Sequence, residues 1–313
     1  MTRAFTFPGQ GSQAVGMGKE LADAFPAARA VFDEIDNALD QKLTDLMWNG
    51  PEDELTLTEN AQPALMAVSL AAMRVLESEG GWSLADKASF VAGHSLGEYS
   101  ALAAAGTFTI ADTARLLKIR GKAMQAAVPV GRGAMAAMLG LSFEDAIAVA
   151  EEAAQGEVCS AANDNADGQV VISGAKAAVE RAAEIAKTKG AKRAMLLPVS
   201  APFHCALMQP AADAMADALA EVDMKAPSVP LVANVTASAV TDPVEIRALL
   251  VDQVTGMVRW RETVKYLAGQ GVTELVEVGA GKVLTGLTRR IDKSVSGSAV
   301  GTPADVASFL ESL

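Results

Sequence analysis

Gly93-His94-Ser95-Leu96-Gly97 lies between an apolar run over Ala88–Ala92 and Ala- and Leu-rich sequence over Tyr99–Ala105. This order predicts a strand, a sharp turn and a helix, with a serine at the apex of the turn. A serine in that place is exposed at the positive end of the helix, where developing negative charge is stabilised. The pattern therefore predicts a nucleophile elbow around Ser95. An ordinary strand-to-helix turn with a capping serine is the alternative, since Gly-x-Ser-x-Gly also arises by chance.

The composition limits the class of protein. Half of the 313 residues are apolar and 4% are aromatic, which indicates a soluble, helix-rich globular chain. No stretch reaches about 18 uninterrupted apolar residues, and the first residues lack the apolar core of a signal peptide, so we expect no membrane association. Two cysteines without metal-site spacing, Cys159 and Cys205, favour a cytoplasmic protein without metal or cofactor. A formal charge of −12 argues against nucleic-acid binding, and nothing requires more than a monomer.

The strand and helix patterns predict an α/β fold in two parts. The main part has strands at Ala4–Phe7, Val229–Val235 and Glu274–Val278. Residues 135–199 follow a separate strand-helix-strand-strand-helix-strand rhythm, with elements over Met135–Leu141, Phe143–Gln155, Val158–Ala162, Gln169–Ser173, Ala175–Lys189 and Arg193–Val199. This βαββαβ order is that of a ferredoxin-like unit. We therefore predict a core over residues 1–130 and 200–313 and an inserted small domain over residues 131–199.

A serine nucleophile needs a base, and histidine is the usual choice at neutral pH. The chain contains two histidines. His94 directly precedes Ser95, and adjacent side chains on a tight turn point apart, so it is a poor base for its neighbour. His204, in a loop after the last small-domain strand, is then the candidate base. A structural or surface role for this histidine is the alternative.

No acid stands out as the third member of a catalytic triad. In α/β-hydrolases the acid follows a strand and lies between the serine and the histidine in chain order. Asp164 and Asp167 fall in a predicted loop of the small domain, and the other acids of this interval fall mostly on presumed helix faces. We therefore expect an amide or a backbone carbonyl to orient His204, which leaves a dyad.

Arg120 lies on the apolar side of a predicted helix over Ile110–Ala127, among Leu116, Leu117 and Met124. A guanidinium is costly to bury unpaired, so it needs an anionic partner. A structural salt bridge, or a side chain that extends outward to solvent, would satisfy this need. The other possibility is a substrate carboxylate, held by two hydrogen bonds.

Taken together, the motifs resemble those of malonyl-CoA:acyl carrier protein transacylases of the stand-alone bacterial type. The resemblance runs almost from end to end and rests on Phe7-Pro8-Gly9-Gln10-Gly11-Ser12-Gln13, Gln62-Pro63-Ala64-Leu65, Gly93-His94-Ser95-Leu96-Gly97-Glu98-Tyr99, Arg120-Gly121, Pro202-Phe203-His204, Gln253 and Glu277-Val278-Gly279-Ala280-Gly281. It implies a hydrolase-like α/β core with a mainly parallel sheet and a ferredoxin-like insert. Ala280 and Met257 stand where the family pattern has prolines, which concerns turn rigidity rather than activity.

The resemblance also implies roles for individual residues. Ser95 would be the nucleophile, His204 its base, and Gln253 would orient the histidine through its backbone carbonyl. The backbone N–H groups of Gln10 and Leu96 would form the oxyanion hole. Arg120 would bind the malonyl carboxylate, and further residues would line the substrate pocket: Phe203, Gln62 and Asn163.

The implied reaction is a ping-pong transfer of malonyl from malonyl-CoA to acyl carrier protein, which supplies extender units for fatty acid synthesis. Two other functions are compatible with parts of the sequence. A thioesterase or esterase would use water as the acceptor but would leave Arg120 without a purpose. A non-catalytic module that binds carrier protein would need neither Ser95 nor His204.

Overall fold

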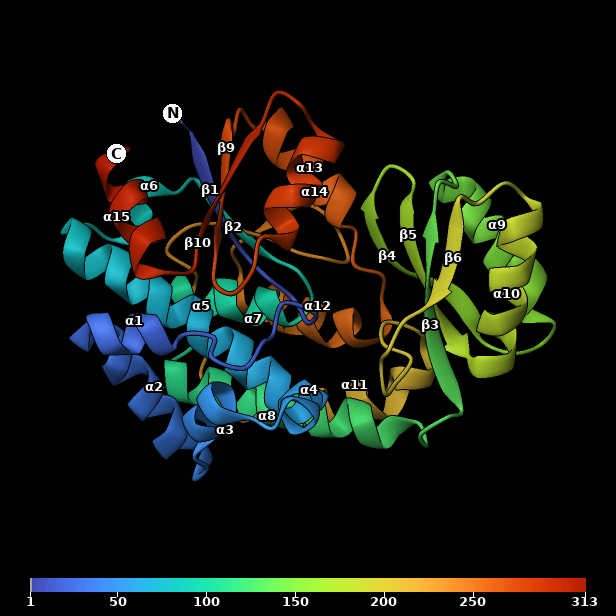
Figure 1. Ribbon diagram of the computed structural model, residues 1–313, viewed down its shortest axis with the longest axis horizontal. Coiled ribbons are helices and arrows are strands. Elements are labelled where there is room, and N and C mark those ends of the chain that lie inside the picture. The colour runs from blue at the N-terminus through green and yellow to red at the C-terminus, as the bar shows by residue number, and fades with distance from the viewer. Residues whose placement is uncertain (1) are drawn as a thin grey trace.

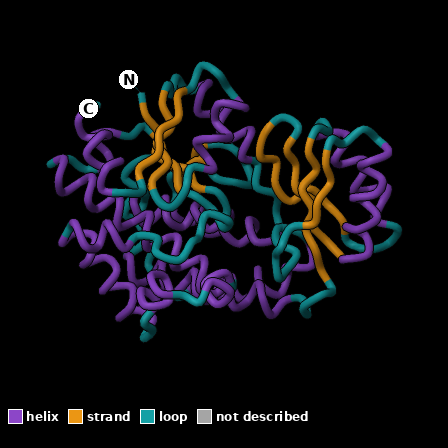
Figure 2. Tube along the Cα trace, in the orientation of Figure 1, coloured by secondary structure: helices purple, strands orange, loops and turns teal. Residues whose placement is uncertain are grey.

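The computed structural model describes residues 2–313 and contains two sheets within this range. Figure 1 shows a larger body, in which many helices surround one sheet, and a smaller unit of a second sheet covered by α9 and α10. Both ends of the chain lie on the larger body. Figure 2 separates the two groups of strands clearly, with loops and helix ends between them.

The larger sheet has the strand order β10-β9-β1-β2-β7-β8. Its pairings are parallel except that of β7 with β8, which is antiparallel. The strands span Arg3–Phe7 (β1), Phe90–Gly93 (β2), Leu231–Val232 (β7), Ala239–Val240 (β8), Glu274–Val278 (β9) and Ser296–Val300 (β10). A mainly parallel sheet requires crossover helices, which here cover both of its faces.

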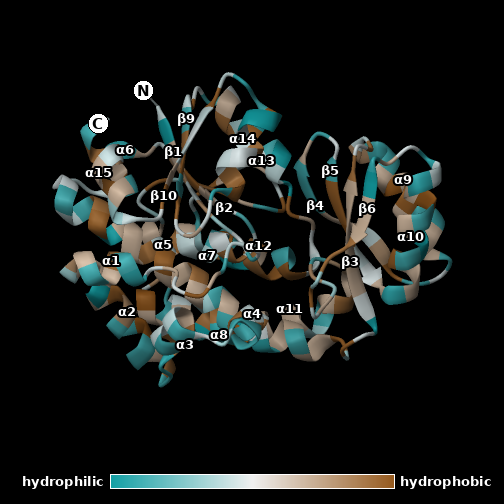
Figure 3. Cartoon of the chain, in the orientation of Figure 1, coloured by the Kyte–Doolittle hydropathy of each residue, from teal (hydrophilic) through white to brown (hydrophobic). Residues whose placement is uncertain are grey.

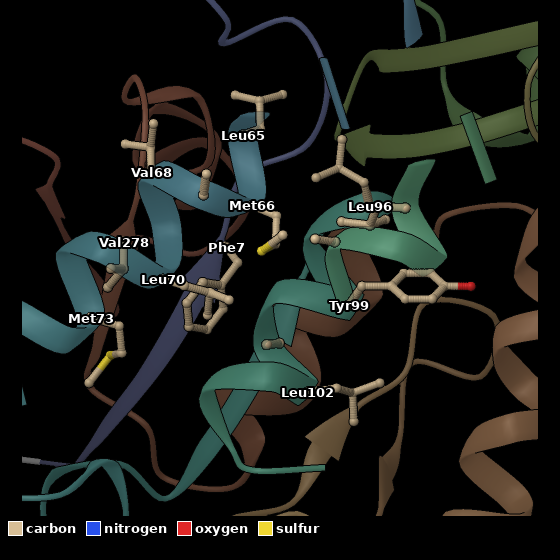
Figure 4. Packing of buried hydrophobic residues seen from close by; sticks show 14 of the residues in the cluster. Phe7, Leu65, Met66, Val68, Leu70, Met73, Leu96, Tyr99, Leu102 and Val278 are labelled. Carbon is tan, nitrogen blue, oxygen red and sulfur yellow. The ribbon is translucent and has the colours of Figure 1, made fainter. Parts of the chain in front are cut away.

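Alternate residues of the strands enter two different apolar clusters. Phe5 and Phe7 of β1 pack into the large cluster formed with the helices on one face of the sheet. Ala4, which points the other way, packs with Trp260 and neighbouring residues on the opposite face. Figure 4 shows part of the large cluster, with Phe7 and Val278 of the sheet near apolar side chains of α5 and α7.

The helices of the body differ in how they are buried. α5 (Thr58–Gly80) is buried almost all round, while α2 (Pro26–Leu39) and α14 (Val283–Ile291) bury one face each. The others are α1 (Lys19–Ala24), α3 (Leu43–Asn49), α4 (Glu52–Thr56), α6 (Leu84–Lys87), α7 (Leu96–Ala104), α8 (Ile110–Ala127), the 3₁₀ turn η1 (Ala206–Met208), α11 (Gln209–Ala220), α12 (Pro243–Thr255), α13 (Trp260–Gly269) and α15 (Pro303–Glu311).

The second sheet is antiparallel, with the order β4-β5-β3-β6. Its elements are β3 (Gly133–Leu139), α9 (Phe143–Ala154), β4 (Cys159–Ala166), β5 (Gln169–Ala175), α10 (Lys176–Thr188) and β6 (Arg193–Leu196). The predicted βαββαβ order and the mixed α/β class are therefore confirmed. Figure 3 shows hydrophilic and hydrophobic residues side by side on α9 and α10. Their buried faces are largely alanine, which lets the helices approach the sheet closely.

Some predicted elements were wrong in extent. The strand expected over Val229–Val235 is only Leu231–Val232, because the chain turns after it and pairs back with β8. Asp164, expected in a loop, lies within β4, which extends four residues beyond the predicted end at Ala162. The limits predicted for the core and the small domain stay a prediction. No helix within residues 2–313 has the length and apolarity needed to cross a membrane.

Candidate active site

Ser95 lies between β2 and α7 with φ 54° and ψ −111°, a conformation that a residue with a side chain rarely adopts. The two flanking glycines make this turn possible. A Cβ on Gly93 would collide with the carbonyl of Gly97, and a Cβ on Gly97 would collide with the carbonyl of Phe7. Such backbone strain costs on the order of 1–3 kcal/mol and persists only where the surroundings enforce it. The predicted strand, turn and helix are present, and the turn has the geometry of an elbow.

Asn234, which follows β7, holds the elbow in place. Its Oδ1 accepts a hydrogen bond from the Ser95 N–H at 2.8 Å, and its Nδ2 donates to the Gly93 carbonyl at 2.6 Å. The side chain is fully buried. Sequence reasoning missed this residue, because it falls inside the strand predicted over Val229–Val235, whereas β7 ends two residues before it, at Val232.

Ser95 and His204, far apart in the chain, meet with Ser95 Oγ 2.7 Å from His204 Nε2. His204 Nδ1 lies 2.8 Å from the Gln253 carbonyl and 3.1 Å from that of Gly256. Since a carbonyl can only accept, Nδ1 carries the proton and Nε2 accepts from the serine hydroxyl. Burial, with a further contribution from the Arg120 cation, lowers the pKa of His204 to about 3. The imidazole is therefore neutral at neutral pH and can receive a proton.

Arg120 projects from α8 and is 1% exposed, so it does not extend outward to solvent. Its Nη1 donates to Gln62 Oε1 at 2.8 Å, and its Nη2 donates to Gln253 Oε1 at 2.7 Å and to Ser95 Oγ at 3.2 Å. Within residues 2–313 it forms no salt bridge, which removes the structural ion pair as an explanation for its burial. The guanidinium is thus a buried cation held by neutral oxygens beside the serine hydroxyl.

Glu98, in the first turn of α7, is the buried acid nearest to this arrangement. Its Oε2 accepts from Gln253 Nε2 at 2.9 Å and from the Asn234 N–H at 3.2 Å. Burial raises the pKa of this carboxyl to about 7, against the lowering effect of these hydrogen bonds. Sequence reasoning missed Glu98, because an acid in the first turn of a helix is common for electrostatic reasons alone. It touches Gln253 rather than His204, so the histidine is oriented by backbone carbonyls.

A cavity of about 570 Å³ opens beside Ser95, between the body and the antiparallel sheet. It brings together eight of the nine predicted site residues: Gln10, Gln62, Ser95, Leu96, Arg120, Asn163, Phe203 and His204. Gln253 is fully buried behind them and reaches the site through its carbonyl and its side-chain amide. Met124 and Met135 add apolar wall that sequence reasoning did not assign.

Leu96 and Gln10 border the cavity next to the serine. Leu96 is the first residue of α7, so its N–H has no partner inside the helix. Gln10 follows β1, and its side chain accepts from Thr58 Oγ1 at 2.9 Å. That their N–H groups bind an oxyanion stays a prediction. Among residues 2–313, no group of three or more His, Cys, Asp or Glu side chains is arranged to hold a metal ion.

The antiparallel sheet is fastened to the body through β4. Asn163 forms a parallel bridge with Val258, and the fully buried Asp164 accepts from Arg261 Nε at 2.9 and 3.0 Å. Asn165 Oδ1 lies 2.9 Å from Nε2 of His94. His94 therefore links the turn to the second sheet.

Comparisons with known proteins agree with this geometry. A family model described as an acyl transferase domain matches residues 4–305. The malonyl CoA-acyl carrier protein transacylase of Escherichia coli K12 is 50% identical over 308 residues, 98% of each chain. The crystal structure of an acyl-carrier-protein-S-malonyltransferase from Bartonella henselae has a TM-score of 0.97 and 59% identity, covering 100% of this chain and 99% of that one.

Another similar structure is a complex of a type II PKS acyl-carrier protein with its malonyl-transacylase. It has a TM-score of 0.96 and 46% identity, and the match covers 100% of both chains. A family match over nearly all of the chain, together with relatives of this similarity, establishes the family. The chain belongs to the acyl transferase domain family.

Proposed function

We propose that this protein transfers the malonyl group of malonyl-CoA to the phosphopantetheine thiol of acyl carrier protein, through a malonyl ester on Ser95. The observation that carries this proposal is the position of Arg120 relative to the serine. This buried cation has no carboxylate partner within residues 2–313, and it lies 3.2 Å from the hydroxyl that a neutral histidine can deprotonate. The site thus combines acyl transfer chemistry with a place for an anionic acyl group.

The first half-reaction follows from the contacts of Ser95. Its Oγ attacks the thioester carbonyl while its proton passes to His204 Nε2. The N–H groups of Leu96 and Gln10 stabilise the oxyanion of the tetrahedral intermediate. When the C–S bond breaks, the proton on His204 goes to the coenzyme A thiolate, leaving the malonyl ester. The Gln253 carbonyl keeps the imidazole in the orientation that both transfers require.

The second half-reaction uses the same groups in reverse. His204 takes the proton of the carrier thiol, and the resulting thiolate attacks the ester carbonyl. Collapse of the intermediate breaks the bond to Ser95 Oγ, which recovers a proton from His204. Water competes with the thiol at this stage, and the partly apolar walls around the ester disfavour it.

The geometry favours malonyl over longer dicarboxylic acyl groups. In malonyl, one methylene separates the carboxylate carbon from the carbonyl carbon that is attacked. A cation that binds this carboxylate must therefore lie close to the nucleophile, as Arg120 Nη2 does. Its second nitrogen, Nη1, provides the other arm of a planar donor fork.

The relatives support the choice of acceptor and setting. Proteins 44–50% identical to this chain are named malonyl CoA-acyl carrier protein transacylases, and one structural neighbour is bound to an acyl-carrier protein. We place the protein in the supply of extender units for fatty acid synthesis in the cytoplasm. We also propose that the protein acts as a monomer, since Ser95, His204 and Arg120 of one chain meet at the same cavity.

Mass spectrometry of the intact protein tests this function. Incubation with malonyl-CoA should add one malonyl group to the wild type and to the control variant Ser100→Ala. This control removes a buried serine hydroxyl from α7, the helix that follows Ser95. Ser95→Ala should remain unlabelled, and added holo-acyl carrier protein should convert the label into malonyl-carrier. Release of free malonate, with no transfer to carrier, would identify a hydrolase instead. No label on the wild type would indicate a non-catalytic module.

A further inference from the structure

Glu98 does not line the cavity and does not contact His204, but it contacts the residue that supports both Ser95 and Arg120. We propose that Glu98 is a positioning residue that sets the preference for malonyl. Its carboxyl fixes the side-chain amide of Gln253, and this amide aims the guanidinium of Arg120 into the cavity. The inference rests on the proposed function, since it concerns the recognition of the malonyl carboxylate.

The Gln253 side-chain amide is hydrogen-bonded at both ends. Its Nε2 donates to Glu98 Oε2 and to the Ser95 carbonyl, each at 2.9 Å. Its Oε1 accepts from Arg120 Nη2 at 2.7 Å. An amide turned by 180° would direct its NH₂ at the guanidinium, donor against donor. Glu98 presents an acceptor to Gln253, and it thereby favours the orientation that Arg120 needs.

Arg120 depends on two such amides. Its hydrogen bonds go to Gln62 Oε1, Gln253 Oε1 and Ser95 Oγ, and its Nε has no hydrogen-bond partner within residues 2–313. The Gln62 amide is fixed in turn, because its Nε2 donates to Thr58 Oγ1 at 2.8 Å. Each of the two amides is therefore oriented by a further contact. Glu98 supplies that contact on the side of Gln253.

The separation of Glu98 from Arg120 has a chemical purpose. A carboxylate in direct contact with the guanidinium would occupy the donors that the malonyl carboxylate needs. With Gln253 between them, Glu98 polarises the amide that Arg120 contacts, while Arg120 still borders the cavity. The arrangement supports the cation without competing with the substrate.

Glu98 also contacts the Asn234 N–H and, through Gln253, reaches the Ser95 carbonyl. A residue that only stabilised the elbow through these contacts would affect all acyl groups equally. Positioning of Arg120 predicts a different result, in which the loss falls mainly on the acyl group that carries a carboxylate. Comparison of malonyl-CoA with acetyl-CoA as donors separates the two roles.

The test measures kcat/KM for covalent loading from each donor in the wild type, Glu98→Gln, Glu98→Met and Ser100→Ala. Glu98→Gln keeps an oxygen that can accept from Gln253, so the malonyl-to-acetyl ratio should stay within about threefold of the wild-type value. Glu98→Met removes the acceptor at similar volume and should lower the ratio by about tenfold or more, mainly through KM for malonyl-CoA. Ser100→Ala, a buried polar substitution on the same helix outside the network, should leave the ratio unchanged.

A second variant covers the case in which Glu98→Met does not fold. Gln253→Met keeps the carbonyl that orients His204 and removes the amide, so it should lower the ratio as Glu98→Met does. The double variant should show no additional loss, because both changes break one chain of contacts. Equal losses for both donors, which leave the ratio unchanged in Glu98→Met or Gln253→Met, would overturn the inference. The proposed function would still stand in that case if the wild type is loaded with malonyl. Absence of malonyl loading by the wild type would overturn both.

Discussion

The six-stranded body and the four-stranded antiparallel sheet contribute to the cavity in different ways. The body carries the groups proposed to react or to bind charge: Ser95, His204, Arg120 and Gln253. The antiparallel sheet and the loop after it supply wall, including Met135, Asn163 and Leu197–Val199. The body thus holds the groups proposed to act together with part of the wall, and the second sheet adds the rest of the wall.

The packing of the two parts explains this division. The body buries large side chains on both faces of its sheet, Phe5, Phe7 and Trp260 among them. The buried cluster of the antiparallel sheet consists of six alanines and two valines with Met138, Leu141 and Ile172. Both the strained backbone of Ser95 and the burial of the Arg120 charge cost free energy on their own. They therefore require surroundings that resist relaxation. Of the two parts, the body has the larger core.

Removal of the base from the body should have the largest effect. His204→Ala should slow malonyl loading by about 10²–10⁴-fold, the usual range for a general base. The other histidine of the chain provides the control, since His94 contacts Asn165 rather than the serine hydroxyl. His94→Gln should cost about tenfold at most, measured by the rate of appearance of the acylated protein. Equal losses in the two variants would remove the distinction between base and turn residue.

The loss of loading activity in Arg120→Ala should be the second largest, and its size should depend on the acyl donor. The malonyl carboxylate would lose its cation, so kcat/KM for malonyl-CoA should fall by about 10²–10³-fold. Loading from acetyl-CoA should change by less than about tenfold, because no charge is left unpaired. Arg115→Ala is the matched control, since this arginine lies on the same helix but is exposed. If both donors lost activity equally, Arg120 would be a structural residue.

The connection between the two parts should affect stability more than chemistry. Arg261→Met leaves the fully buried Asp164 without its partner, which should lower the free energy of unfolding by about 3 kcal/mol. Burial already raises the pKa of Asp164, so the unpaired carboxyl is unfavourable where it lies. Urea unfolding measures the change, and kcat/KM for malonyl-CoA should fall only a few-fold. Lys187→Met breaks an exposed pair with Glu184 and should cost less than about 1 kcal/mol. An equal cost in both variants would contradict the importance of this attachment.

The smallest expected effect concerns pH. A base must be neutral, and the pKa of His204 is lowered to about 3, so its neutral form persists as the pH falls from 8 to 6. Loading should change by less than about twofold, whereas a histidine of ordinary pKa would be only about one quarter neutral at pH 6. Glu98, with a pKa of about 7, titrates in the same interval, so the rate is measured in Glu98→Gln. A decline with a midpoint near pH 6.5 in that variant would show that His204 is not held neutral.

Local patterns in the sequence were sufficient for much of the fold. Two glycines around Ser95 predicted the turn because no side chain fits beside the neighbouring carbonyls. The alternation of strands and helices predicted the order along the chain of the elements that form the second sheet and its two helices. The short strand β7 and the antiparallel β8 were not predictable in extent, since pairing partners rather than propensity define them. β10 and the last three helices were not predicted.

For the site, the sequence by itself predicted the candidate reactive groups, and the structure brings Ser95, His204 and Arg120 together. With only two histidines in the chain, the search for a base was short, and Arg120 was out of place on an apolar helix face. Only the tertiary structure decided how these groups are held. Asn234 and Glu98 lie 139 and 136 residues from the groups they contact, Ser95 and the Asn234 N–H respectively. Residue types predict chemistry because chemistry is a property of the side chain. The partners of a buried polar group depend on which distant segments pack together, and no local pattern encodes that.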